Sequence, residues 1–292
     1  MRVGHDHAQI ERVFLREVRG RPQGDFMSEL LAVFNTDKAD RAADVIFIHG
    51  LDGNAQTTWQ VAGRQDTFWP AWLGEDLPNI GVWSLGYEVS SLAWRGTTMP
   101  LSDRALNALT LLDTYDIGKR PVIFIVHSMG GLLVKQMLRH ARDLNDPAWA
   151  AVMNAARGIV FLSTPHSGSD IASWVKHVGT LLRASVSIKE LEAHDPRLRE
   201  LNVWYRNNVG ALGVKTQVYY EKYPTHGVLV VNATSADPGI SGVTPVPMDA
   251  DHSTITKPED RNALIYRSVK RFVESCLAEP PRREPESAAN PR

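Results

Sequence analysis

A serine stands in a short turn between an apolar run and an amphipathic run. Residues 121–138 read PVIFIVHSMGGLLVKQML, in which Val122 to Val126 is apolar and mostly β-branched and the residues after the turn are apolar at helical spacing. A buried strand followed by so sharp a turn is expected to lift the hydroxyl of Ser128 clear of the backbone. This order of strand, serine turn and helix is typical of the nucleophile elbow of an α/β-hydrolase. The usual G-x-S-x-G pattern has glycine where this chain has Val126.

A serine hydroxyl becomes a useful nucleophile when a base takes its proton and an acid orients that base. In this fold the three follow the chain order serine, acid, histidine, with the histidine in a loop after the last strand. His252, in the loop DADHSTITKP, has that place and is the predicted base. Glu221, at the end of the strand-like run VYYE, is the favoured acid, and Asp237, in SADPGISG, is the alternative.

The negative charge that develops on a substrate oxygen needs two N–H donors. One is expected from Met129, the residue after the serine, and the other from Leu51 in the glycine loop HGLDG. His49 in that loop is interpreted as shaping it. His166, in TPHSG, is interpreted as part of a structural loop, because no second ligand lies at metal-site spacing. We find no phosphate loop, dinucleotide fingerprint or H-E-x-x-H motif, so neither a cofactor nor a metal is predicted.

Strand-like and helical runs alternate along the chain, which predicts a mostly parallel sheet flanked by helices. The predicted strands, besides the one before Ser128, are Glu29–Asn35 (an edge strand), Ala43–Gly50, Ile80–Gly86, a run beginning at Gly158, Val214–Glu221 and Gly227–Val231, with a short extended piece at Val243–Met248. The predicted helices, besides the one after Ser128, are Thr67–Leu77, Leu101–Tyr115, 147–156 and Pro258–Leu277. The mostly helical stretch 170–210 is predicted to be an insertion that acts as a lid.

Composition and length limit the remaining choices. The chain has 292 residues, of which 43% are hydrophobic and 22% charged, and its formal net charge is -1. We expect one α/β-hydrolase domain over residues 26–278, a loose lead-in over 1–25 and a disordered tail over 279–292. The balanced charge argues against nucleic acid as a partner. The single cysteine and the lack of an apolar stretch of about 20 residues predict a cytoplasmic protein without a transmembrane segment.

Several motifs in a fixed order make the chain resemble the serine-active-site-containing protein family. This lipase-like α/β-hydrolase group is related to the glycosylphosphatidylinositol inositol-deacylases. The resemblance runs from about Asp44 to Lys257 and rests on IFIHGLDG, SLGY, VHSMGGLLVK, RGIVFLSTPHSG, YEKYPT, TSAD and DADHSTITKP. Family members usually carry glutamate where this chain has Thr234, whereas Glu221 matches the glutamate at the strand end. The resemblance therefore implies that Glu221 supplies the acid.

Together these features predict a serine carboxylic-ester hydrolase of lipase or esterase type that works through an acyl-enzyme. Ser128 would attack, His252 would relay the proton and Glu221 would orient His252. The family resemblance favours a lipid or another acyl ester as substrate, hence a role in lipid metabolism, with transient contact at a membrane surface. Two alternatives stay open: a lipid acyltransferase with the same triad, and a catalytically inactive binding protein with the hydrolase fold. The sequence does not fix the oligomeric state.

Overall fold

The computed structural model describes residues 28–87, 100–166 and 195–278. The predicted lead-in at 1–25, the predicted tail at 279–292 and residues 170–194 of the predicted insertion lie outside the described residues. The remainder of that insertion is mainly a helix, α8 (Asp195–Asn208).

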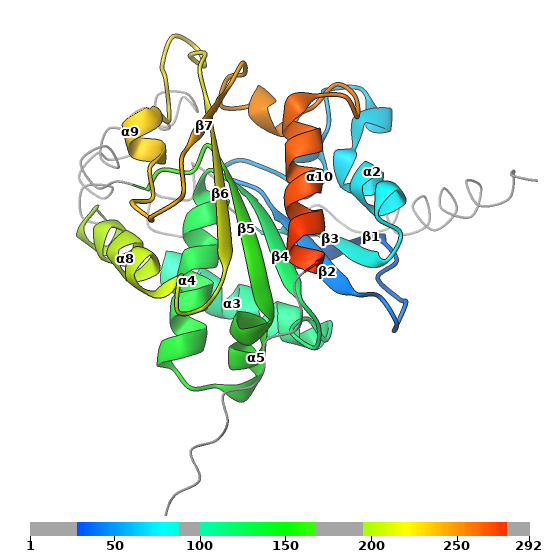
Figure 1. The fold of residues 1–292 in the computed structure, drawn as a ribbon, viewed down its shortest axis with the longest axis vertical. Helices are drawn as coiled ribbons and strands as arrows, with labels where there is room; N and C mark the ends of the chain where they lie inside the picture. The colour runs from blue at the N-terminus through cyan, green and yellow to red at the C-terminus, as the bar shows by residue number, and fades with distance from the viewer. Residues whose placement is uncertain (1–27, 88–99, 167–194, 279–292) are drawn as a thin grey trace, which may run out of the picture.

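The described residues form a seven-stranded sheet in the order β1-β3-β2-β4-β5-β6-β7. Only its edge strand β1 is antiparallel to its neighbour, and the other pairs are parallel. The strands are β1 (Glu29–Phe34), β2 (Ala43–Ile48), β3 (Ile80–Gly86), β4 (Val122–His127), β5 (Ala156–Leu162), β6 (Lys215–Glu221) and β7 (Val246–Met248). Because the strands from β2 to β7 run in one direction, their carboxyl ends meet at one edge of the sheet (Figure 1).

Helices cover both faces of this sheet (Figure 1). One apolar cluster joins the sheet to the helices α3 (Leu101–Thr114), α4 (Met129–Asp143), α5 (Pro147–Ala155) and α8. A second cluster joins the opposite face to α2 (Trp69–Asp76) and α10 (Leu264–Leu277). The strands β2, β3 and β4 are buried along their whole length, which explains their nearly continuous apolar sequences. The fold is that of an α/β-hydrolase, as the sequence predicts.

The prediction of a strand at Gly227–Val231 is wrong. Thr225 and Val228 form a single bridge in a turn, and the segment then leaves the direction of the sheet. A hydrogen bond to a side chain replaces strand pairing here. The N–H of Val231 donates to the buried carboxylate of Glu221 at 2.6 Å, so this backbone group is not paired with a strand. The predicted extended piece ending at Met248 takes the outer place as β7.

The last helix begins at Leu264, six residues later than predicted. Residues 258–263 turn instead, and the carboxylate of Asp260 accepts the N–H of Asn262 at 2.7 Å. An aspartate that bonds the backbone two residues on stabilises a turn in competition with a helix.

Candidate active site

Ser128 stands at the junction of β4 and α4 with φ 51° and is buried. A positive φ is uncommon for a residue other than glycine and stores strain that its surroundings must hold. Two neighbours do so here. The N–H of Ser128 donates to the carbonyl of Leu162 at 2.9 Å, and the hydroxyl of Thr164 donates to the carbonyl of Ser128 at 3.0 Å. Strand β5 and the loop after it therefore fix the turn that the sequence predicts.

Two glycines let this turn lie against the end of β2. A Cβ atom on Gly130 would stand 2.5 Å from the carbonyl oxygen of Ile48, and one on Gly50 would stand 2.7 Å from the Cβ of Ser128. No side chain fits at such distances from backbone or from another Cβ. Val126, which replaces the usual glycine, is fully buried in the apolar cluster beneath α3 and α4. Its larger side chain is thus accommodated within the core.

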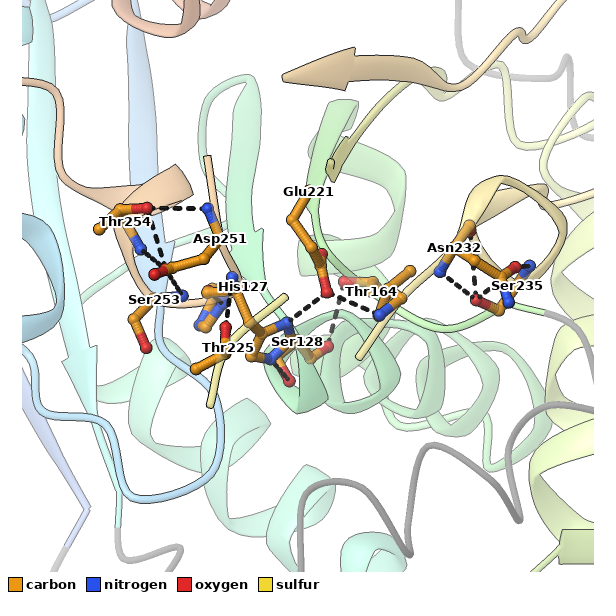
Figure 2. Close-up of polar contacts among 12 residues, drawn as sticks. His127, Ser128, Thr164, Glu221, Thr225, Asn232, Ser235, Asp251, Ser253 and Thr254 are labelled. Atoms are coloured by element: carbon orange, nitrogen blue, oxygen red, sulfur yellow. Dashed lines mark hydrogen bonds and ion pairs between the residues drawn. The ribbon is translucent and has the colours of Figure 1, made fainter. Parts of the chain in front are cut away.

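The structure brings Ser128, His252 and Glu221 together. Nε2 of His252 lies 3.1 Å from Oγ of Ser128, and Nδ1 of His252 lies 3.2 Å from Oε1 of Glu221. Figure 2 shows Glu221 and Ser128 joined by this chain of polar contacts. The three side chains come from the elbow, the end of β6 and the loop after β7, which all meet at the carboxyl edge of the sheet.

The carboxyl group of Glu221 is buried yet favours its ionised form. Burial raises its pKa, but the hydrogen bond from His252 and the charge of that imidazole lower it, so the pKa lies below the ordinary value. An ionised carboxylate only accepts hydrogen bonds, so Nδ1 of His252 must carry the proton that points to it. The lone pair of Nε2 is then directed at the hydroxyl of Ser128. This arrangement is able to take the hydroxyl proton.

Asp237, the alternative acid, does not reach His252. It follows the short helix α9 (Ala233–Ala236), and its exposed carboxylate accepts the N–H of Gly239 at 2.8 Å. Thr234, where the family usually has glutamate, is also exposed. The chain therefore places Glu221, and not a residue of this segment, beside the imidazole.

The two predicted oxyanion donors flank the elbow. Met129 is the first residue of α4, where N–H groups have no partner within the helix, and Leu51 follows Gly50 in the loop after β2. Among the described residues, no acceptor receives the N–H of either Leu51 or Met129. Both donors are therefore available to a ligand, and the partial positive charge at the start of α4 favours an anion there.

His49 shapes the glycine loop HGLDG after β2, as its sequence position suggests. Its Nδ1–H donates to the carbonyl of Gly50 at 2.8 Å, and the hydroxyl of Tyr87 donates to the carbonyl of His49 at 2.7 Å. The two rings stack with their centroids 4.5 Å apart. Burial lowers the pKa of His49 from 6.5 to about 4, so the imidazole is neutral near pH 7.

His166 lies in a buried polar group beside α4. Its Nδ1 is 2.7 Å from Nζ of Lys135, which also donates to Asn202 on α8 at 2.8 Å. The N–H of His166 donates to the carbonyl of Ser235 at 2.6 Å. Within the ranges that the structure describes, no three histidine, cysteine, aspartate or glutamate side chains gather as metal ligands.

Two side chains that the sequence reasoning missed hold the backbone of His252. His127 reaches its carbonyl oxygen and Thr225 reaches its N–H, each at 2.9 Å. The sequence position of His127 could have indicated a role at the site, since this residue directly precedes the serine and ends a buried strand. The position of Thr225 could not, because no sequence pattern links a threonine in a turn to a loop 27 residues away.

We expect the fold to lose stability as the pH falls below about 6.5. Burial lowers the pKa values of His49, His127 and His166, so these rings stay neutral in the fold while the unfolded chain takes up protons. Proton uptake by the unfolded state alone lowers the free energy of unfolding as pH falls. For His49, whose pKa drops from 6.5 to about 4, the loss is on the order of 3 kcal/mol and is complete near pH 4. Urea midpoints at pH 7.5 and 4.5 measure it, and equal midpoints would contradict it.

Known proteins resemble this chain over most of its length. The profile of the family described as "PGAP1-like alpha/beta domain" matches residues 41–256. The chain is 34% identical to "Protein SERAC1" of Danio rerio over 261 residues, which cover 80% of this chain and 39% of that protein. The human protein of that name is also 34% identical, over 81% of this chain and 39% of its own length. The chain thus spans about two fifths of the length of these relatives.

Solved esterases share the fold. Est1E from Butyrivibrio proteoclasticus, solved with ferulic acid bound, superposes with a TM-score of 0.55 at 12% identity, covering 86% of this chain and 96% of that one. A structure from a study of carboxylesterases of Nitrososphaera gargenis gives a TM-score of 0.53 at 13% identity, with coverage of 88% and 97%. Of the helices that the structure describes, none has the length and apolar character to cross a membrane.

Proposed function

The chain belongs to the PGAP1-like alpha/beta domain family, and from this premise we propose that it is a serine ester hydrolase that works through an acyl-enzyme. The observation that carries the proposal is the unbroken series of contacts from Oγ of Ser128 through His252 to Glu221, with spacings of 3.1 and 3.2 Å. A nucleophile within reach of a base, which is itself oriented by a buried acid, is the arrangement that acyl transfer needs.

The reaction follows from this geometry. Nε2 of His252 takes the proton of Ser128 as Oγ attacks the carbonyl carbon of the ester, and the carboxylate of Glu221 stabilises the imidazolium that forms. The N–H groups of Leu51 and Met129 hold the oxyanion. His252 returns the proton to the leaving alcohol, which departs and leaves the acyl group on Ser128. A water molecule, deprotonated by His252, then attacks the acyl-enzyme and frees the acid and the serine.

We propose a lipid or another small acyl ester as the substrate, because the family likeness favours it. Transfer of the acyl group to a second lipid, in place of water, uses the same residues and differs only in the acceptor. The sequence holds a single cysteine, which fits a reducing compartment, and we propose a cytoplasmic location on that ground.

Intact-mass measurement after exposure to a fluorophosphonate probe tests the proposal. We expect one adduct per chain, mapped to Ser128 by peptide sequencing, because only a serine activated by a base reacts quickly with this probe. Protein unfolded in urea before exposure is the control and should gain no adduct. A folded chain that stays unlabelled would contradict the hydrolase mechanism. Product ratios from an ester panel, with and without an acceptor alcohol, then separate hydrolysis from transfer.

A further inference from the structure

The backbone of His252 is held from two sides by side chains that do not touch Ser128's hydroxyl. Its N–H donates to Oγ1 of Thr225 at 2.9 Å, and its carbonyl oxygen accepts from Nε2 of His127 at 2.9 Å. His127 ends β4, and Thr225 lies in the turn after β6. In Figure 2 both labelled residues lie close to Ser128, around the loop that carries the imidazole.

The contact fixes the proton of His127. A carbonyl oxygen can only accept, so Nε2 of His127 must carry the hydrogen. Its other nitrogen faces the glycine loop HGLDG, where a Cβ added to Gly50 would come within 3.1 Å of Nδ1. The side chain thus spans the space between that loop and the backbone of His252.

His127 must also stay neutral for the contact to serve catalysis. Its ring lies 4.8 Å from that of His252, and two positive imidazoles at that distance repel each other. Burial holds the pKa of His127 well below its usual range, the charge of a protonated His252 lowers it further, and the bond to the backbone of His252 opposes this only in part. His252 is therefore able to take a proton beside a neutral neighbour.

We propose that His127 is a positioning residue that, with Thr225, clamps the backbone of His252 and so sets the approach of its Nε2 to Oγ of Ser128. The inference rests on the proposed function for its catalytic consequence. His127 directly precedes Ser128 in the sequence. One segment therefore positions both the nucleophile and the loop that carries His252. A misplacement of about 1 Å in such an arrangement costs on the order of 100-fold in rate.

Paired substitutions test the clamp. His127→Phe keeps a ring but removes the donor, whereas His127→Gln places an N–H near the position of Nε2. We expect His127→Phe to lower kcat about 10- to 100-fold with KM within about twofold, and to slow fluorophosphonate labelling by a similar factor. His127→Gln should recover most of both rates. Equal rates in the two variants, or an unchanged kcat in His127→Phe, would overturn the proposal.

Thr225 supplies an independent pair should His127→Phe fail to fold, as judged by its urea midpoint. Thr225→Val should reduce kcat as His127→Phe does, and Thr225→Ser, which keeps the acceptor, should not. A lower kcat in Thr225→Val at a urea midpoint close to that of the parent, with recovery in Thr225→Ser, separates positioning of His252 from a loss of stability.

Imidazole ¹⁵N NMR keeps this inference separate from the proposed function. Whether or not the parent hydrolyses esters, His127 should appear as a neutral ring protonated at Nε2 at pH 7. A ring protonated at Nδ1, or at both nitrogens, would overturn the clamp. A parent that shows this tautomer but takes up no fluorophosphonate would instead contradict the hydrolase mechanism and leave the contact established.

Discussion

Replacing Ser128 by alanine is expected to lower kcat/KM for an ester by about 10⁵-fold or more, because the acyl-enzyme can no longer form. The change removes one oxygen and leaves the turn's own bonds in place, since the contacts to Leu162 and Thr164 use the backbone of Ser128. The variant should therefore fold with an unchanged urea midpoint and bind substrate with a similar KM. Steady-state rates on a short-chain ester and circular dichroism measure the two quantities.

The double variant of Ser128 and His252 tests whether the two residues act together. His252→Ala should lower kcat/KM nearly as much as Ser128→Ala does. The double variant should have the same kcat/KM as Ser128→Ala alone, because the two residues act as a unit. Ser253→Ala and His226→Asn are matched controls, since both residues are exposed, and asparagine tolerates the positive φ of His226. Multiplicative losses in the double variant, or losses in the controls, would contradict a shared role.

Much of this fold was predictable because its elements follow simple periodicities. Buried parallel strands such as β2 and β4 read as apolar runs, and an elbow needs a serine between such a run and an amphipathic helix. Chain order then predicted the placement of His252, because the loops after parallel strands gather at one edge of the sheet. The structure does bring that imidazole to Ser128 at 3.1 Å.

The predictions failed where a polar side chain outweighed an apolar pattern. The segment GVLVV has the composition of a strand, yet the carboxylate of Glu221 accepts the N–H of Val231. Strand-like pairing of this segment is limited to the single bridge between Thr225 and Val228. The clamp at His127 was hidden for a similar reason. Its partner is a backbone carbonyl 125 residues away, and backbone atoms leave no trace in a sequence.

The choice between the two candidate acids shows the limit of chain order. Glu221 and Asp237 both lie between the serine and the histidine, so order alone permits either. The structure separates them by burial: Glu221 is enclosed at the end of β6, whereas Asp237 caps an exposed turn.

Glu221→Gln is expected to lower kcat by about 10²- to 10³-fold with little change in KM. Oε1 of Glu221 accepts both the N–H of Val231 and the Nδ1–H of His252, so an amide oxygen in its place would keep both bonds and the fold should persist. The amide lacks the negative charge that stabilises the imidazolium formed when His252 takes the proton of Ser128, so the loss should fall on the rate. Steady-state kinetics near pH 7 and the urea midpoint measure the separate effects on rate and stability.

Asp237→Asn is the matched control, since it makes the same chemical change in the alternative acid. We expect its kcat to stay within about twofold of the parent, because the carboxylate of Asp237 accepts the N–H of Gly239 in an exposed turn and an asparagine oxygen is able to do the same. Since the pKa of Glu221 lies below its ordinary value, the parent should keep its acid ionised through the neutral range, and raising the pH should not rescue Glu221→Gln. A large loss in Asp237→Asn with full activity in Glu221→Gln would transfer the role of acid to Asp237 and require the segment 232–239 to move towards His252.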